Sequence, residues 1–132
     1  MSATFHDLQQ LDNPMNGTRL ETAATIAELF RSLRDRKPFL FELSGDNGFM
    51  LTIGFAGNCG SVQYSPSDGS PPYLVAVADD AVDDGKLVEF LAGNTPTPIP
   101  RRFCLPTDQV EKIAAEFLTR GGKSTAVAWE GI

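Results

Sequence analysis

The stretch FLFELSGDNGFMLTIGFAGNCGSVQY, residues 39–64, decides the fold class of this chain of 132 residues. Apolar side chains recur at every second position in it, first over residues 39–43 and again over residues 49–55. Two segments rich in glycine and asparagine, residues 44–48 and 57–60, follow these alternations and are typical of turns. Because successive side chains of a strand point to opposite faces, the stretch predicts an antiparallel meander with one face on a core.

Upstream of the meander the sequence predicts a helix. Apolar residues recur there at helical spacing from Ala23 to Leu33, and Thr18 and Glu21 have the spacing of a capping box. The helix should end before Pro38, because a residue that precedes proline avoids the helical conformation. Residues 1–17 lack periodicity and contain Asn-Pro and Asn-Gly breakers, so we expect a flexible N-terminal arm there.

Downstream of the meander we expect two more strands, at residues 73–78 and 87–91. Residues 94–100 contain three prolines at alternate positions. Since proline has no backbone N–H to donate, this segment cannot lie inside a sheet and should form an edge or a crossing connection.

A second helix and a closing strand end the chain. Thr107 and Asp108 are rival N-caps for this helix, and Gly121 with Gly122 supplies its stop. Residues 126–129 then predict a short terminal strand. The complete pattern predicts a single α+β domain over residues 18–132, in which both helices pack on one face of an antiparallel sheet.

The second helix carries one apolar stripe, which we expect to face the core. Trp129, the only tryptophan, should lie in the core or at its margin, because its strand must pack under this helix. We therefore predict structural roles for four residues: Val110, Ile113, Phe117 and Trp129.

Composition and charge restrict the partners of this chain. Hydrophobic residues make up 42% and charged residues 21%, which indicates a globular domain rather than a disordered segment. The formal net charge of -6 disfavours nucleic acid and anionic membranes, because phosphate binding requires clustered lysine and arginine. We see neither a signal peptide nor an apolar run of membrane-spanning length, so we expect a cytoplasmic protein with reduced Cys59 and Cys104.

No set of catalytic residues is evident in the sequence. The only histidine, His6, falls in the expected arm, so a cysteine nucleophile would lack a base nearby. Cysteine and histidine spacing does not fit a zinc site, and the aspartates of residues 79–84 do not fit an EF-hand loop. The glycines of residues 54–60 match no nucleotide-binding fingerprint. The sequence therefore predicts a protein that is not an enzyme and holds neither cofactor nor metal.

One short segment concentrates negative charge. Asp79, Asp80, Asp83 and Asp84 lie within six residues, between two predicted strands. Such a run is either a solvated loop or a docking site at which charge accelerates the encounter with a basic partner. Asp68, in the preceding serine- and proline-rich loop, is the second candidate for partner contact.

The C-terminal third carries a family resemblance. A proline-containing segment leads to Leu105-Pro106 at a helix start, the helix ends in Phe117-Leu118 followed by Gly121, and the closing strand contains Trp129-Glu130. In this order the elements resemble the first family of bacterial polymorphic-toxin immunity proteins. With the less specific meander, the resemblance covers about three quarters of the chain. The sequence departs from the family at Ser124, where such proteins often have a proline.

The resemblance implies a cytoplasmic antidote that binds a toxin delivered between bacteria and blocks it, in a one-to-one complex. Toxins paired with such proteins include deaminase-fold enzymes that act on nucleic acid and therefore need a basic substrate cleft. Two rival interpretations stay open. An acidic secretion-system chaperone would be a dimer that wraps an effector segment, and a small enzyme would have a deep polar pocket around Cys59 or Cys104.

Overall fold

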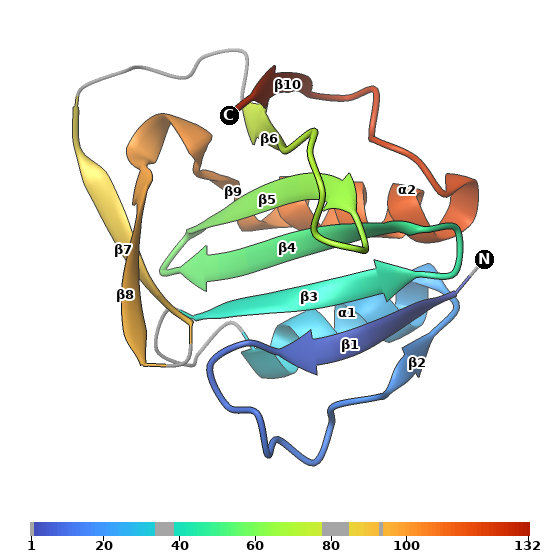
Figure 1. The fold of residues 1–132 in the computed structure, drawn as a ribbon. Coiled ribbons are helices and arrows are strands. Elements are labelled where there is room, and N and C mark those ends of the chain that lie inside the picture. The colour runs from blue at the N-terminus through green and yellow to red at the C-terminus, as the bar shows by residue number, and fades with distance from the viewer. Residues whose placement is uncertain (1, 34–38, 78–84, 93) are drawn as a thin grey trace.

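The computed structural model describes residues 2–33, 39–77, 85–92 and 94–132. In these residues the chain forms a large antiparallel sheet, a separate two-stranded ribbon and two α-helices. Both helices lie behind the sheet in Figure 1, and the face toward the viewer carries no helix among the described residues. The arrangement is the predicted α+β fold with its helices on one face. Neither described helix is long and apolar enough to cross a membrane.

The predicted meander forms the centre of the sheet. Its strands pair in sequence order, and Phe41, Leu51, Ile53 and Val62 all point to the buried face. A fourth strand, β6, pairs with the third strand of the meander, β5. The complete order across the sheet is β10-β6-β5-β4-β3-β1-β2, and the short strand β9 also pairs with β5. The four central strands are β3 (Leu40–Gly45), β4 (Phe49–Ala56), β5 (Cys59–Pro66) and β6 (Leu74–Val77).

The N-terminus corrects the expectation of a flexible arm. Residues Ala3–Asp7 form β1, which pairs antiparallel with β3 over five residues and with β2 (Arg19–Leu20). Phe5 is fully buried, and the Asp7 carboxylate accepts hydrogen bonds from the backbone N–H groups of Gln9 and Gln10 at 2.8 and 2.9 Å. Only two apolar residues alternate in this strand, which is too short a pattern to be recognised in the sequence.

The first helix, α1 (Ala23–Leu33), starts later than predicted. Its capping box is formed by Thr22 and Thr25, each of which accepts a hydrogen bond at 3.2 Å from the backbone N–H of the other. The predicted pair Thr18 and Glu21 cannot cap, because the residues between them form β2. Phe30, fully buried on α1, packs edge-on against Phe41 and Phe55 of the sheet.

The second helix, α2 (Thr107–Arg120), packs its apolar stripe against the core. Gly121 caps its C-terminus in the left-handed conformation at φ 74°, and its N–H donates to the Phe117 carbonyl at 2.8 Å. The N-cap is Pro106, so no side chain caps the start and the predicted caps at Thr107 and Asp108 are wrong. Two short elements lead into this helix, η1 (Arg101–Phe103) and β9 (Leu105–Pro106).

The closing strand, β10 (Ala128–Gly131), pairs with β6 at one end of the sheet order, two residues later than predicted. Trp129 is half-buried, and its indole N–H donates to the backbone carbonyl of Ser124 at 2.9 Å. The Ser124 hydroxyl accepts the backbone N–H of Ala126 at 3.1 Å. This hydrogen bond holds the turn into β10.

The proline-containing segment forms the outer strand of a ribbon. Strands β7 (Leu87–Ala92) and β8 (Thr95–Pro100) pair antiparallel and belong to a sheet of their own. We expected β7 to continue the main sheet as its fifth strand, but it pairs with β8 in the separate two-stranded sheet. The prolines of β8 occupy every second position, so they face the same edge of the strand. The residues between them can donate backbone hydrogen bonds to β7, whereas the outer edge of β8 lacks the N–H groups that prolines do not have. The segment is therefore an edge strand, as predicted.

Candidate partner-binding surface

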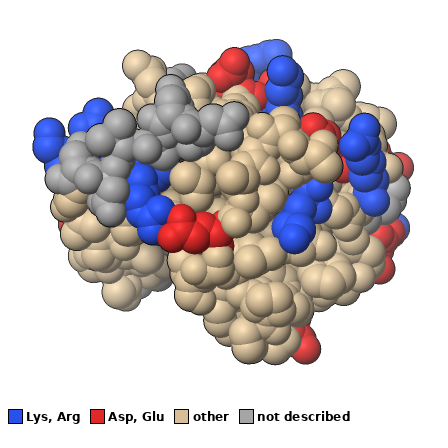
Figure 2. Space-filling model, turned by 90° about the horizontal axis from the view of Figure 1, so that it is seen from above, with Lys and Arg blue, Asp and Glu red and all other residues tan. Residues whose placement is uncertain are grey.

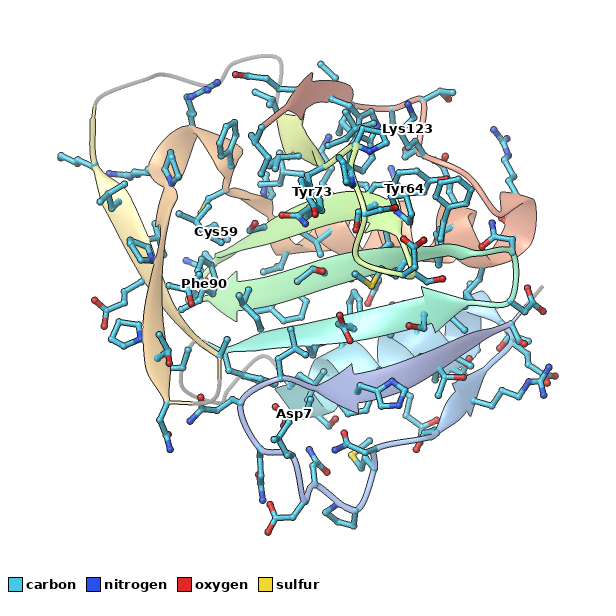
Figure 3. The ribbon with its side chains drawn as sticks, viewed as in Figure 1. Asp7, Cys59, Tyr64, Tyr73, Phe90 and Lys123 are labelled. Carbon is cyan, nitrogen blue, oxygen red and sulfur yellow. The ribbon has the colours of Figure 1, made fainter. Side chains whose placement is uncertain are left out.

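The ribbon is anchored on the helix-free face of the main sheet. Phe90 of β7 is fully buried, and a Cβ placed on Gly54 of β4 would come within 2.6 Å of its ring and within 2.9 Å of Leu40. Only glycine leaves room for this ring, so the ribbon packs against the sheet at Gly54. Phe90 lies at the end of the sheet that the ribbon crosses in Figure 3.

A groove of about 390 Å³ lies between β8 and the helix-free face. The sheet forms its floor with side chains from four neighbouring strands: Leu40, Thr52, Ser61, Gln63 and Val75. The wall consists of residues 97–100 of β8, Phe103 of η1 and the C-terminal Ile132. This combination of an apolar wall with a few polar groups is typical of a binding site.

The polar side chains of the floor have no hydrogen-bond partner among the described residues. Thr52, Ser61 and Gln63 form no side-chain hydrogen bond with any described residue, although Ser61 is only 4% exposed. Thr52 and Gln63 are direct cross-strand neighbours, and their side chains lie on the same face of the sheet. A ligand in the groove would therefore meet adjacent hydroxyl and amide groups that are available for hydrogen bonds.

An ion pair fixes the wall of the groove. The Arg102 guanidinium donates to both carboxylate oxygens of Glu130, at 2.5 and 2.6 Å, and so joins η1 to β10. The central guanidinium carbon of Arg102 (Cζ) also lies 4.2 Å from the centre of the Phe103 ring. The hydrogen bonds from Arg102 hold the pKa of Glu130 below its usual value. Glu130 is therefore charged and already neutralised by its partner.

Of the five acidic residues predicted to contact a partner, the structure describes only Asp68. Asp79, Asp80, Asp83 and Asp84 lie outside the described residues. Asp68 is exposed in the connection after β5, where the hydroxyl and backbone N–H of Ser70 donate to its carboxylate at 2.6 and 2.9 Å. These hydrogen bonds lower the pKa of Asp68 and turn the carboxylate toward its own loop.

The charges seen from above in Figure 2 are scattered. Lysine and arginine side chains stand singly among uncharged residues, with a few acidic neighbours and no acidic patch among the described residues of this view. The described residues of this view therefore form no continuous acidic surface.

The residues predicted to be structural lie behind the groove rather than in it. Val110, Ile113 and Phe117 are at most 1% exposed in the core between α2 and the sheet. Trp129 packs partly buried at the margin of the same core, with its ring 6.1 Å from that of Tyr64.

The two cysteines lie beside each other where β5 pairs with β9. Cys59 begins β5 and Cys104 directly precedes β9, which pairs with β5, so the two cysteines are close neighbours. Burial, and then the neighbouring Cys59, raises the pKa of Cys104 from 9.0 to about 12. Cys104 is thus a protonated thiol at neutral pH and a poor nucleophile.

A cysteine–histidine pair has no geometric basis in the sheet. His6 lies on β1, and strands β3 and β4 separate it from Cys59 on β5. Three strand spacings correspond to roughly 14 Å, well beyond hydrogen-bond reach. No cluster of three or more metal-ligating residues occurs in the described parts of the chain.

Sequence reasoning missed the groove. Leu40 and Val75 are apolar residues at strand positions whose side chains point away from the helices, where the alternation predicts contact with solvent. Gly54 lies in the interior of a strand. These three positions were the available signals that another segment covers this face.

The fold and the groove together define a small α+β domain with a preformed, largely apolar groove on its helix-free face. The family model of the Imm1 immunity proteins matches residues 15–131. The chain therefore belongs to the Imm1 immunity protein family, and its partner is a cognate toxin. No curated protein matches the chain.

Proposed function

We propose that this immunity protein neutralises an antibacterial toxin that acts on nucleic acid, most simply a deaminase, by covering its active site. The complex forms in the cytoplasm of the producing bacterium and contains one copy of each protein. Family membership supports the toxin as partner, and the net charge of -6 supports a basic substrate cleft as the surface that is covered.

The single observation that carries this proposal is the groove on the helix-free face. Its floor belongs to a sheet with continuous pairing from β3 to β6, and the Arg102–Glu130 ion pair fixes its wall. Such a surface loses little conformational freedom when a partner binds, which favours tight binding. Tight binding is needed, because each unbound toxin molecule continues to damage its producer. Nuclease–immunity complexes reach dissociation constants of about 10⁻¹³–10⁻¹⁶ M.

The test is protection of bacterial cells that express the cognate toxin, which we expect to be encoded by a gene next to this one. Cells that co-express the immunity protein should grow, whereas cells with an empty vector should not. A catalytically inactive toxin, which should be harmless with either plasmid, is the control. If co-expression raised the amount or the export of the toxin without protecting the cells, the secretion-chaperone interpretation would replace this proposal.

A further inference from the structure

A row of side chains crosses the helix-free face perpendicular to the strands. Cross-strand pairing places Glu42 of β3 beside Thr52 of β4, Thr52 beside Gln63 of β5, and Gln63 beside Val75 of β6. Val75 in turn lies opposite Glu130 of β10. The three middle members are floor residues of the groove, so a carboxylate stands beyond each end of the floor.

The two carboxylates differ in their partners. Glu130 is neutralised by its two hydrogen bonds from Arg102. Glu42 is half-exposed and makes no ion pair or side-chain hydrogen bond with any described residue. The described lining of the groove contains no lysine or arginine. Among the described residues around the groove, the charge without a counter-ion is therefore the negative charge of the Glu42 carboxylate. It lies at the end of the floor nearest β3.

We propose that the groove receives the side chain of one arginine of the toxin, whose guanidinium pairs with Glu42. This proposal rests on the proposed function and names the contact through which it operates. The methylene groups of the arginine lie along Pro98 and Ile99, and the guanidinium reaches the polar floor. Thr52 and Gln63 then accept hydrogen bonds from its remaining N–H groups.

Two other occupants fit this site less well. A purely apolar side chain would leave Thr52, Ser61 and Gln63 without partners once water is excluded, which weakens binding. A lysine has three donors on a single nitrogen, whereas the acceptors here are spread along a row over neighbouring strands. The five donors of a planar guanidinium match a row of acceptors better. A toxin that binds nucleic acid also carries arginine in its cleft for phosphate recognition.

The test is a double-mutant cycle with the toxin domain encoded by the adjacent gene as the probe. Glu42→Gln should weaken binding by about tenfold or more, as expected for one member of a close charge pair. Each surface arginine of the toxin is replaced by alanine and measured against both forms of the immunity protein. One of these substitutions should weaken binding to the parent and have little further effect on the Glu42→Gln variant. If every toxin arginine acted independently of Glu42, the proposal would be overturned.

A second variant tests the groove itself. Thr52→Trp fills the floor of the groove with an aromatic residue that strands accommodate well, and should weaken binding by about thirtyfold or more. The matched controls are Glu28→Gln and Thr119→Trp, exposed positions on the two helices, which should bind like the parent. Thermal melting shows whether each variant is folded, and Glu42→Gln remains decisive if Thr52→Trp does not fold.

The outcomes also separate this proposal from the proposed function. A parent protein that does not bind the toxin contradicts the proposed function. A parent that binds and protects, together with folded Glu42→Gln and Thr52→Trp variants of unchanged affinity, contradicts only the assignment of the groove.

Discussion

Phe117→Ala is expected to lower the free energy of unfolding by about 3–5 kcal/mol, the range found for a buried phenylalanine reduced to alanine. Phe117 is fully buried on α2, and its ring stands edge-on to Tyr64 with the centres 6.2 Å apart. The substitution removes this contact and leaves a cavity between the helix and the sheet, which a packed core closes only partly. Urea denaturation of both proteins gives the difference.

Thr119→Ala is the control for this measurement. Thr119 is exposed on the same helix, and its hydroxyl bonds only to backbone carbonyls of the preceding turn. Its replacement should change stability by about 0.5 kcal/mol or less. Equal stabilities of the parent and Phe117→Ala would mean that α2 does not pack on the sheet through this ring.

Replacing Asp79, Asp80, Asp83 and Asp84 together with asparagine is expected to slow association with the toxin without unfolding the protein. This prediction comes from the sequence alone, because the four residues lie outside the described part of the structure. Charge steering can raise association rate constants from about 10⁵–10⁶ to 10⁸ M⁻¹s⁻¹ at low salt. We therefore expect the quadruple variant to associate several-fold more slowly, and surface charge contributes little to stability.

Salt provides the internal control for this prediction. Binding kinetics at low and at high ionic strength should show a large difference between parent and variant at low salt and a small one at high salt, because salt screens exposed charges. Asp68→Asn is the matched single variant, since this carboxylate is bonded to Ser70 in its own loop and should contribute less. Identical rate constants for the parent and the quadruple variant would make residues 79–84 a solvated loop and move attention to Asp68 and its loop.

The elements that could be predicted from the sequence are those with repeated local patterns. The alternation in residues 39–64 predicted the meander, and the apolar stripe of Val110, Ile113 and Phe117 predicted the second helix. The N-terminal strand was missed, because Ala3 and Phe5 alone do not establish a period and its pairing partner β3 lies some forty residues away. The helix caps were misplaced because several threonines and acidic residues compete at each helix start.

The candidate site was harder to predict than the fold, because it depends on contacts between distant segments. No local pattern shows that Phe90 packs against Gly54, or that residues 97–100 form the wall of a groove whose floor contains Thr52 and Gln63. Charge clustering could be found in the sequence and directed attention to residues 79–84. The isolated Glu42 attracts notice only when cross-strand pairing places it beside the groove floor.

The central claim is that this protein inactivates its toxin by occupying the active site, and the most direct measurement is a titration of toxin activity. Purified toxin is held at a concentration far above the dissociation constant, and its activity, deamination of nucleic acid under the proposed function, is followed as the immunity protein is added. If one immunity protein blocks one toxin molecule, activity should fall linearly and reach zero at one equivalent. A toxin that stays fully active while size-exclusion chromatography shows the complex to be formed would contradict the central claim.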